Sequence, residues 1–321
     1  MSGYGNALSR LWSRKRHFGY ALGRVLVLEG RVMSRARLDR LAHAQGLAEQ
    51  LKVLSETEYA HYVAHATDRD SLQEGIEGRV EAALALLEES RAGEVARFFR
   101  VARDFTNVKV AALGAASGTP YVSLGTVGPD AWRAGDLPEW LAREVETVEK
   151  VQTEDGEAAA AAYVDGRRLA SRLDAAYRLG DPLTTDIAKL DVDMANARLV
   201  VRGAADGFLG GGLIAGEELS RSYAEGGPAG LALRITRGLP DADGVAALEA
   251  DASGDWLEVV AARTLMALAR LGRLRTTTNQ PVVAWMASVE AEARLVSLVV
   301  LGGIDGVSPD VVRQRVAWAH G

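Results

Sequence analysis

The chain has 321 residues, enough for at least two domain-sized cores, and it is 48% hydrophobic and 25% charged. This composition is typical of a globular protein and excludes a disordered chain. The net charge of −6 argues against general nucleic-acid binding. The absence of cysteine excludes disulfides, thiolate metal ligands and cysteine nucleophiles.

Charge is distributed unevenly along the chain. Residues 1–40 hold nine basic and two acidic residues, a local net charge of +7, against −13 for the remainder. For the basic N-terminal extension, residues 1–17, two interpretations stay open: contact with an anionic surface, or a solvated terminus.

No membrane-directed segment is expected. Arg24 and Glu29 interrupt the region after the first basic residues, so it does not form a signal peptide. The longest apolar run, Leu295–Ile304, is far shorter than the roughly 20 residues that cross a bilayer. We therefore expect a water-soluble, cytoplasmic chain.

Nearly every segment is predicted to be helical. Leucines recur at helical spacing over 38–54, an alanine run follows Glu157, and no two-residue alternation persists. Glycine and proline clusters mark helix ends near residues 118–120, 128–129, 135–138, 180–182, 210–212, 226–228 and 240–244. The prediction is an all-α fold of many helices of moderate length.

Three segments align without a gap: residues 104–118, 193–207 and 292–306. Each begins with an acid and contains two glycines at the same spacing. The polar positions of the pattern are Asp104, Asn107 and Lys109 in the first copy, Asp193, Asn196 and Arg198 in the second, and Glu292 in the third. Leu295 and Ser297 replace the Asn and the basic residue in the third copy. A catalytic constellation would not be triplicated and then lost in this way, which favours a structural role.

On a helix, positions 104, 107, 111, 114 and 118 form one stripe, polar at its start and small at its end. Apolar residues flank the stripe, so the helix is expected to be buried, with its last glycine as a left-handed C-cap. Asp104 and Asn107, like their counterparts in the second copy, are expected to hydrogen-bond ends or loops of neighbouring helices. Lys109 lies about 140° around the helix from Asp104 and must face another partner or solvent.

The repeats divide the chain into three helical units after the N-terminal extension. The expected boundaries are 18–125, 126–213 and 214–321, which suit the glycine and proline clusters. Each unit is expected to be built around one repeat helix.

No phosphate loop or zinc site is indicated. Gly210–Gly212 lacks the strand and helix of a dinucleotide fingerprint and is interpreted as a linker. His61 and His65 are spaced for zinc, with Glu58 a turn earlier, but no second ligand cluster accompanies them. A surface helix face is the preferred interpretation of this pattern.

Paired aspartates give the only hint of magnesium chemistry. Asp68 with Asp70, and Asp191 with Asp193, are two residues apart and so point to different faces of a helix, whereas magnesium-binding all-α enzymes need carboxylates one turn apart. No catalytic residue, metal site or cofactor is therefore assigned.

The repeats resemble the family of the C subunits of V/A-type rotary ATPases, whose eukaryotic V-ATPase members are called d subunits. The family signature, an acid, two residues, Asn, one residue and Lys/Arg, occurs in the first two copies. The resemblance extends to Tyr20–Ser34 (YALGRVLVLEGRVMS), Leu54–Tyr59 (LSETEY) and Glu290–Val316, and so from about residue 18 to the end. Two features depart from the family pattern: the longer basic N-terminus, and the third copy, which lacks the Asn and the basic residue.

The resemblance implies a funnel of three helical units around a pseudo-threefold axis, on the cytoplasmic face of the membrane proteolipid ring. Its cavity would receive the foot of the central stalk, and the subunit would rotate and transmit torque for ion transport, without nucleotide or ion sites of its own. The ion carried, and whether ATP is made or consumed, belong to other subunits. Two alternatives stay open: a generic helical-repeat adaptor, and an all-α magnesium-dependent enzyme.

Overall fold

A computed structural model describes residues 19–114, 121–204, 207–236, 256–275, 279–308, 310–313 and 316. Across these residues the chain forms helices and no strand, which confirms the all-α prediction. A first helix covers residues 19–29. It is followed by α2 (Arg35–His43), α3 (Gly46–Leu54), α4 (Ala60–Val63), α5 (Arg69–Glu89), α6 (Gly93–Lys109), the π-helical turn η1 (Val110–Gly114), α7 (Pro129–Ala134), α8 (Glu139–Asp155), α9 (Glu157–Leu179), α10 (Pro182–Val201), α11 (Gly216–Thr236), α12 (Trp256–Arg273) and α13 (Gln280–Ile304). The basic extension, residues 1–17, lies outside the described part.

Local sequence signals set several helix ends. The Asp68 side chain accepts the backbone N–H of Ser71 at 2.8 Å and begins α5. Asp181 accepts the N–H of Leu183 at 2.9 Å and begins α10 in the same way. Gly180, with φ +66°, closes α9 in the left-handed conformation that glycine adopts most readily. A two-residue connection therefore turns α9 directly into α10.

The left-handed glycine cap was predicted at Gly118, the last glycine of the first repeat, which lies outside the described residues. In the third repeat the equivalent glycine, Gly306, has φ +79° and follows the end of α13. In the second repeat the first glycine, Gly203, has φ +72° and follows the end of α10 at Val201.

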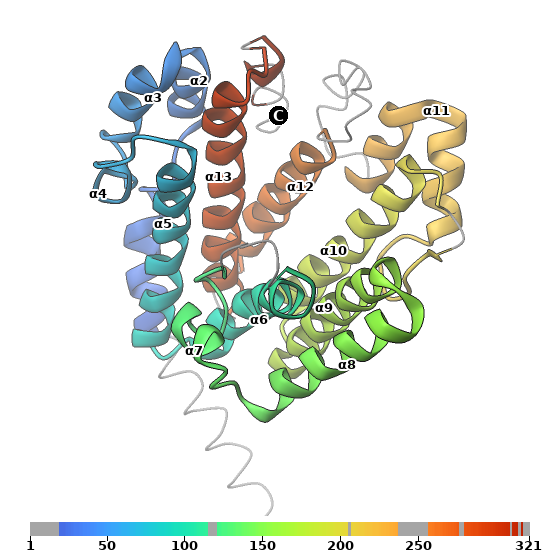
Figure 1. Ribbon diagram of the computed structural model, residues 1–321. Coiled ribbons are helices and arrows are strands. Elements are labelled where there is room, and N and C mark those ends of the chain that lie inside the picture. The colour runs from blue at the N-terminus through green and yellow to red at the C-terminus, as the bar shows by residue number, and fades with distance from the viewer. Residues whose placement is uncertain are drawn as a thin grey trace, which may run out of the picture.

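The three repeats lie on α6, α10 and α13, and these helices have a cyclic pattern of neighbours. The helix before each of them, α5, α9 or α12, packs against it. In addition, α6 packs on α9, α10 packs on α12, and α13 packs on α5. Each repeat helix therefore contacts the long helix of its own pair and the long helix of the next pair. Helices α12 and α13 lie in the middle of the molecule, between α2–α5 on one side and α8–α11 on the other (Figure 1).

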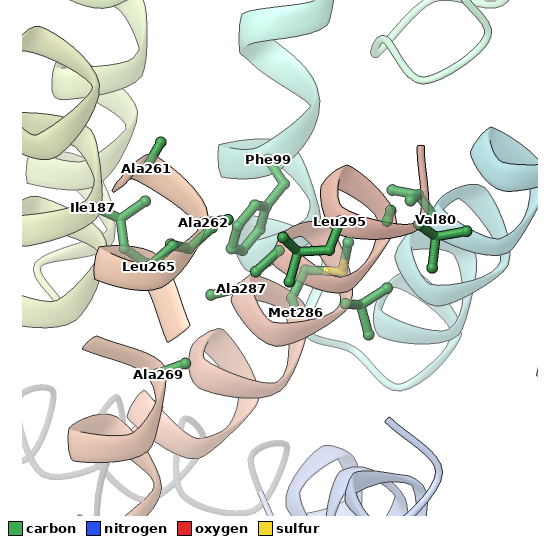
Figure 2. Packing of buried hydrophobic residues seen from close by; sticks show 14 of the residues in the cluster. Val80, Phe99, Ile187, Ala261, Ala262, Leu265, Ala269, Met286, Ala287 and Leu295 are labelled. Atoms are coloured by element: carbon green, nitrogen blue, oxygen red, sulfur yellow. The ribbon is translucent and has the colours of Figure 1, made fainter. Parts of the chain in front are cut away.

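One large apolar cluster joins helices from the whole length of the chain. Figure 2 shows side chains of α5, α6, α10, α12 and α13 meeting in it. Helix α13 is buried on nearly all sides, and alanines such as Ala284 and Ala287 allow its neighbours to approach closely. A second, smaller cluster lies under α7 and α8 and includes Trp132 and Phe105. The expected unit boundaries fall in the loops after α6 and α10, and the division into three units stays a prediction.

The packing of α12 gives a matched test of this core. Leu265 is 3% exposed and Leu271 is 60% exposed on the same helix. We expect Leu265→Ala to lower the free energy of unfolding by about 2–5 kcal/mol, because it removes buried methyl groups and leaves a cavity. Leu271→Ala should change it by less than about 0.5 kcal/mol. Urea unfolding of both variants checks this, and equal losses would contradict the assignment of the α12 inner face.

Candidate functional site

The first repeat holds the loop after α6 through two fully buried side chains. Asn107 Nδ2 donates to the carbonyl of Val122 at 2.9 Å, and the Val122 N–H donates to Asn107 Oδ1 at 2.7 Å. Asp104 accepts the N–H of Thr126 and the Thr126 hydroxyl, each at 2.7 Å. Burial raises the pKa of Asp104, although the bonds from Thr126 oppose that shift. The loop is thereby fixed to the helix.

The second repeat makes the same arrangement on α10. Asn196 Nδ2 donates to the carbonyl of Leu209 at 2.9 Å, and the Leu209 N–H donates back to Asn196 Oδ1 at 2.7 Å. Asp193 Oδ1 accepts the N–H groups of Leu213 at 2.9 Å and Ile214 at 3.1 Å. In both copies the Asn pairs with the N–H and the carbonyl of one residue, and the Asp accepts from the turn that follows. We call each of these two arrangements a loop clamp.

A glycine is required in each loop clamp. A Cβ atom at Gly125 would lie 2.5 Å from Asp104 Oδ1, and one at Gly212 would lie 2.2 Å from Asp193 Oδ1. Gly210–Gly212 lies in the segment that connects α10 to α11, in agreement with its interpretation as a linker. The loop clamp adds a specific requirement at Gly212, whose backbone passes directly over the buried Asp193 carboxylate.

The acid of the third repeat holds a different part of the chain. Glu292 on α13 accepts the backbone N–H of Met33, from the segment between the first helix and α2. Burial raises the pKa of Glu292, while the Met33 N–H, Arg79 and Tyr59 oppose the shift. Leu295, in the Asn position, is 1% exposed within the apolar cluster. The third copy therefore lacks a loop clamp and joins α13 to the N-terminal part of the chain.

The basic positions of the first two repeats connect neighbouring helix pairs. Lys109 on α6 lies 3.8 Å from Asp165 on α9, and Arg198 on α10 pairs with Glu258 on α12. Lys109 thus faces a partner other than Asp104, as its position around the helix predicted. These pairs are partly exposed, so each contributes little to stability, about 0–1 kcal/mol.

Sequence reasoning missed a buried arginine that touches all three repeat helices. Arg172 on α9 places Nε 3.0 Å from Asp191 Oδ2 of α10, and Nη2 3.9 Å from Glu290 Oε2 of α13. Its guanidinium carbon lies 4.8 Å from the ring centre of Phe98 on α6, within the range of a cation–π contact. Only the packing of four helices brings these residues together, so no local sequence signal marked Arg172.

Glu290 is the acidic centre of this network. It is 3% exposed and lies 4.0 Å from a guanidinium nitrogen of Arg103 on α6 and of Arg294 on α13, in addition to Arg172. Burial of a carboxylate is costly unless cations and donors surround it. Three arginines from three helices supply that compensation here.

A cavity of about 540 Å³ adjoins the network. Helices α5, α6, α9, α10, α12 and α13 all contribute to its wall. Its charged lining residues are Glu77, Asp191, Glu258, Glu290, Asp305, Arg103, Arg168, Arg198 and Arg294, and Ser297 also faces it. Burial alone would raise the pKa of Glu258, but Arg198 and Arg294 outweigh that effect and lower it. The cavity is polar and contains both signs of charge.

The candidate metal ligands have other structural roles or no cluster. Asp68 caps α5, Asp191 faces Arg172 and Asp193 holds its loop, so the aspartate pairs do not converge. In the described ranges no three His, Asp or Glu side chains are grouped as a metal site. Nor is any described helix both long and apolar enough to cross a bilayer.

Together these features define an all-α protein in which a repeated acid–asparagine motif fixes loops around a charged central cavity. The family model described as ATP synthase (C/AC39) subunit matches residues 21–315, so the chain belongs to this family. The resemblance to the C subunits of V/A-type ATPases is thereby confirmed. No individual curated protein matches the chain. Family membership associates the chain with a membrane-bound rotary ATPase complex, as a structural subunit.

Loss of a loop clamp should destabilise the fold. We expect Asn107→Leu to lower the free energy of unfolding by about 1–3 kcal/mol, because the N–H and the carbonyl of the half-buried Val122 both lose their side-chain partner. Lys109→Leu, on the same helix but partly exposed, is the control and should cost less than about 1 kcal/mol. Thermal or urea denaturation that finds no loss for Asn107→Leu would contradict a structural role.

The raised pKa of Glu292 predicts a pH-dependent stability difference. A carboxyl whose folded-state pKa exceeds its unfolded value of about 4.5 loses stability as pH rises from that value through the folded pKa. Glu292→Gln keeps an oxygen acceptor for Met33 without the charge. We expect the stability of this variant, relative to the natural chain, to increase as pH rises above about 4.5. Urea unfolding from pH 4 to 7 measures this, and a difference independent of pH would refute it.

Proposed function

We propose that the chain is a non-catalytic rotor subunit that joins the central stalk of a V/A-type ATPase to the membrane proteolipid ring. It transmits torque for ion transport from the cytoplasmic face of the membrane. The cyclic packing of the three repeat helices around a charged cavity is the observation that carries this proposal, together with family membership.

The cyclic packing supports the finer proposal of a pseudo-threefold funnel. In such an arrangement each repeat helix must contact the long helix of the next unit, and the third unit must return to the first. The contacts of α6 with α9, α10 with α12 and α13 with α5 have this order. The acids Asp104, Asp193 and Glu292 would then begin equivalent helix segments related by rotations of about 120°, the angle that three equal units require.

A torque-transmitting element must resist twisting between its two ends. The two loop clamps fix the segments that connect the units, and the network around Arg172 ties α6, α9, α10 and α13 together. Both sets of side-chain contacts hold the helices in fixed positions relative to one another, and neither requires a catalysed reaction. Stiffness of this kind is what a rotor subunit needs.

One end of the molecule holds the charged cavity, and the opposite end exposes apolar side chains. The cavity is lined by Leu301 and Asp305 at the end of α13 and by Gln73 at the start of α5, so it lies toward that end. We assign this end to the stalk. The opposite end carries the exposed side chains of Leu271 (60%) and Leu274 (79%), and we assign it to the ring.

The coupling role can be tested by reconstitution of the complex with and without this subunit. Without it, ATP hydrolysis by the soluble head should continue while ion uptake is lost, because no rotor element then connects the head to the ring. Addition of the natural chain should restore uptake. Undiminished ion uptake in its absence would refute the proposal that this subunit couples the head to the ring. ATP hydrolysis by the purified chain would instead favour the alternative that it is an enzyme.

A matched pair of variants tests the assignment of the ring-facing end. Leu271→Asp with Leu274→Asp should abolish restoration of uptake, because two charges would face an apolar contact. Leu233→Asp, at an apolar position of α11 that is 39% exposed, should restore uptake as the natural chain does. If both variants restore uptake equally, the ring lies elsewhere.

A further inference from the structure

The wall of the central cavity formed by α6, α9, α10, α12 and α13 carries more basic than acidic side chains. Its charged residues, taken with Arg172, which contacts Asp191 and Glu290 from α9, are Arg103, Arg168, Arg198, Arg294, Asp191, Glu258 and Glu290. Five arginines against three acids give 5 − 3 = +2. Two more acids line the cavity, Glu77 and Asp305, and Arg69 pairs with Asp305. With these three residues the balance is 6 − 5 = +1, so the cavity keeps an excess of positive charge.

Two of these arginines have hydrogen-bond donors that the described part of the chain does not use. Arg168 on α9 is half-buried and, among the described residues, has neither a hydrogen bond nor an ion pair. Burial lowers the pKa of its guanidinium, while Asp191 and Asp165 oppose that shift. Arg294 on α13 lies 4.0 Å from Glu290 Oε2 and makes no hydrogen bond within the same described ranges. Each guanidinium carries several N–H donors and no acceptor, so the wall holds donors for an anion.

The cavity has the size of a small-molecule site. Its volume of about 540 Å³ falls within the roughly 300–1,000 Å³ that such sites occupy. Arg294 precedes Asp305, which follows the end of α13, by 305 − 294 = 11 residues, roughly 16 Å along the helix axis. The arginine therefore lies well below the mouth that we assign to the stalk. Apolar side chains, among them Met194, Leu298 and Leu301, also line the cavity.

We propose that the arginine-rich wall of the cavity, centred on Arg168 and Arg294, binds a phosphorylated small molecule. A phosphate ester carries a charge of about −1.5 to −2 at pH 7, which matches the excess of the wall. Its oxygens accept N–H donors from several guanidinium groups at once. A single carboxylate carries one charge and fewer oxygens, so it would leave part of the excess uncompensated. The organic part of the molecule would contact apolar side chains such as Met194 and Leu298.

A metal cation or a basic partner fits this wall less well. Its three acids already face arginines: Asp191 lies beside Arg172, Glu258 pairs with Arg198, and Glu290 has three arginines within 4.0 Å. A further cation would add to a positive excess in a partly buried site, where like charges are poorly screened. The proposal does not depend on the rotor function, since binding is measured on the isolated full chain.

The test is isothermal titration calorimetry of the full chain with inorganic pyrophosphate, which offers phosphate groups without an organic part. We expect saturable binding at a single site with a Kd below about 1 mM. Malonate, a dicarboxylate, should bind at least about tenfold more weakly, because it offers fewer oxygens to the guanidinium groups. Arg168→Gln should lower the affinity for pyrophosphate about tenfold or more, and Arg168→Lys, which keeps the charge, should lower it less.

The matched control is Arg143→Gln, which removes an exposed arginine of α8 outside the cavity and should bind pyrophosphate as the natural chain does. Arg294→Gln, on a different helix from Arg168, should also lower the affinity and serves as a second test variant. Circular dichroism verifies that the variants are folded. Absence of saturable pyrophosphate binding, equal affinity for malonate, or equal losses in the test and control variants would each overturn the proposal.

Discussion

The fold depends on how a buried asparagine satisfies both backbone polar groups of one residue in a half-buried loop. Asn107 and Asn196 each offer one donor and one acceptor to a single residue of a returning loop, as a strand neighbour would. Because unpaired buried polar groups are costly, loop and helix are stable only together. The adjacent Asp104 and Asp193 fix the next turn, so the direction in which the chain leaves each repeat helix is set. That direction carries the chain toward α9 and α12, the helices on which α6 and α10 pack.

The charged network in the interior adds a second constraint of a different kind. Arg172 and Glu290 are 5% and 3% exposed, and each has partners on more than one helix. Such a network contributes little net stability compared with apolar packing, but loss of one partner leaves a buried charge uncompensated. Relative movement of α6, α9, α10 or α13 would separate these charges. The network therefore opposes sliding between helices, which apolar contacts alone would permit, and it lies beside the cavity where we place the stalk.

The sequence was most informative where an interaction is local. The repeats predicted buried helices whose Asp and Asn hold loops, and both clamps lie within 22 residues of the chain. The sequence did not reveal why Gly212 must be a glycine, because nothing local shows that a Cβ atom there would lie 2.2 Å from Asp193 Oδ1. Arg172 and Glu290 were missed for the same reason: they are 118 residues apart, and only tertiary packing reveals their proximity. Lys109, whose direction follows from helix geometry, was placed correctly.

The third repeat lacks the Asn of the first two because its helix packs on a helix from the N-terminal part of the chain. The helix on which each of the first two repeat helices packs comes later in the chain, after α7 and α8 for α6 and after α11 for α10. The loop that leaves the repeat helix leads toward that partner, so an Asn can clamp the loop. The helix on which α13 packs is α5, which lies more than two hundred residues earlier in the chain. Leu295 lies within the apolar cluster, where an apolar side chain fits the core. The acid keeps a function because Met33, from the segment that leads toward α5, supplies the N–H. Two of the three contacts between helix pairs, α6 with α9 and α10 with α12, thus join neighbouring parts of the chain through a clamped loop. The third contact, α13 with α5, is noncovalent and joins the C-terminal helix to the N-terminal part of the chain.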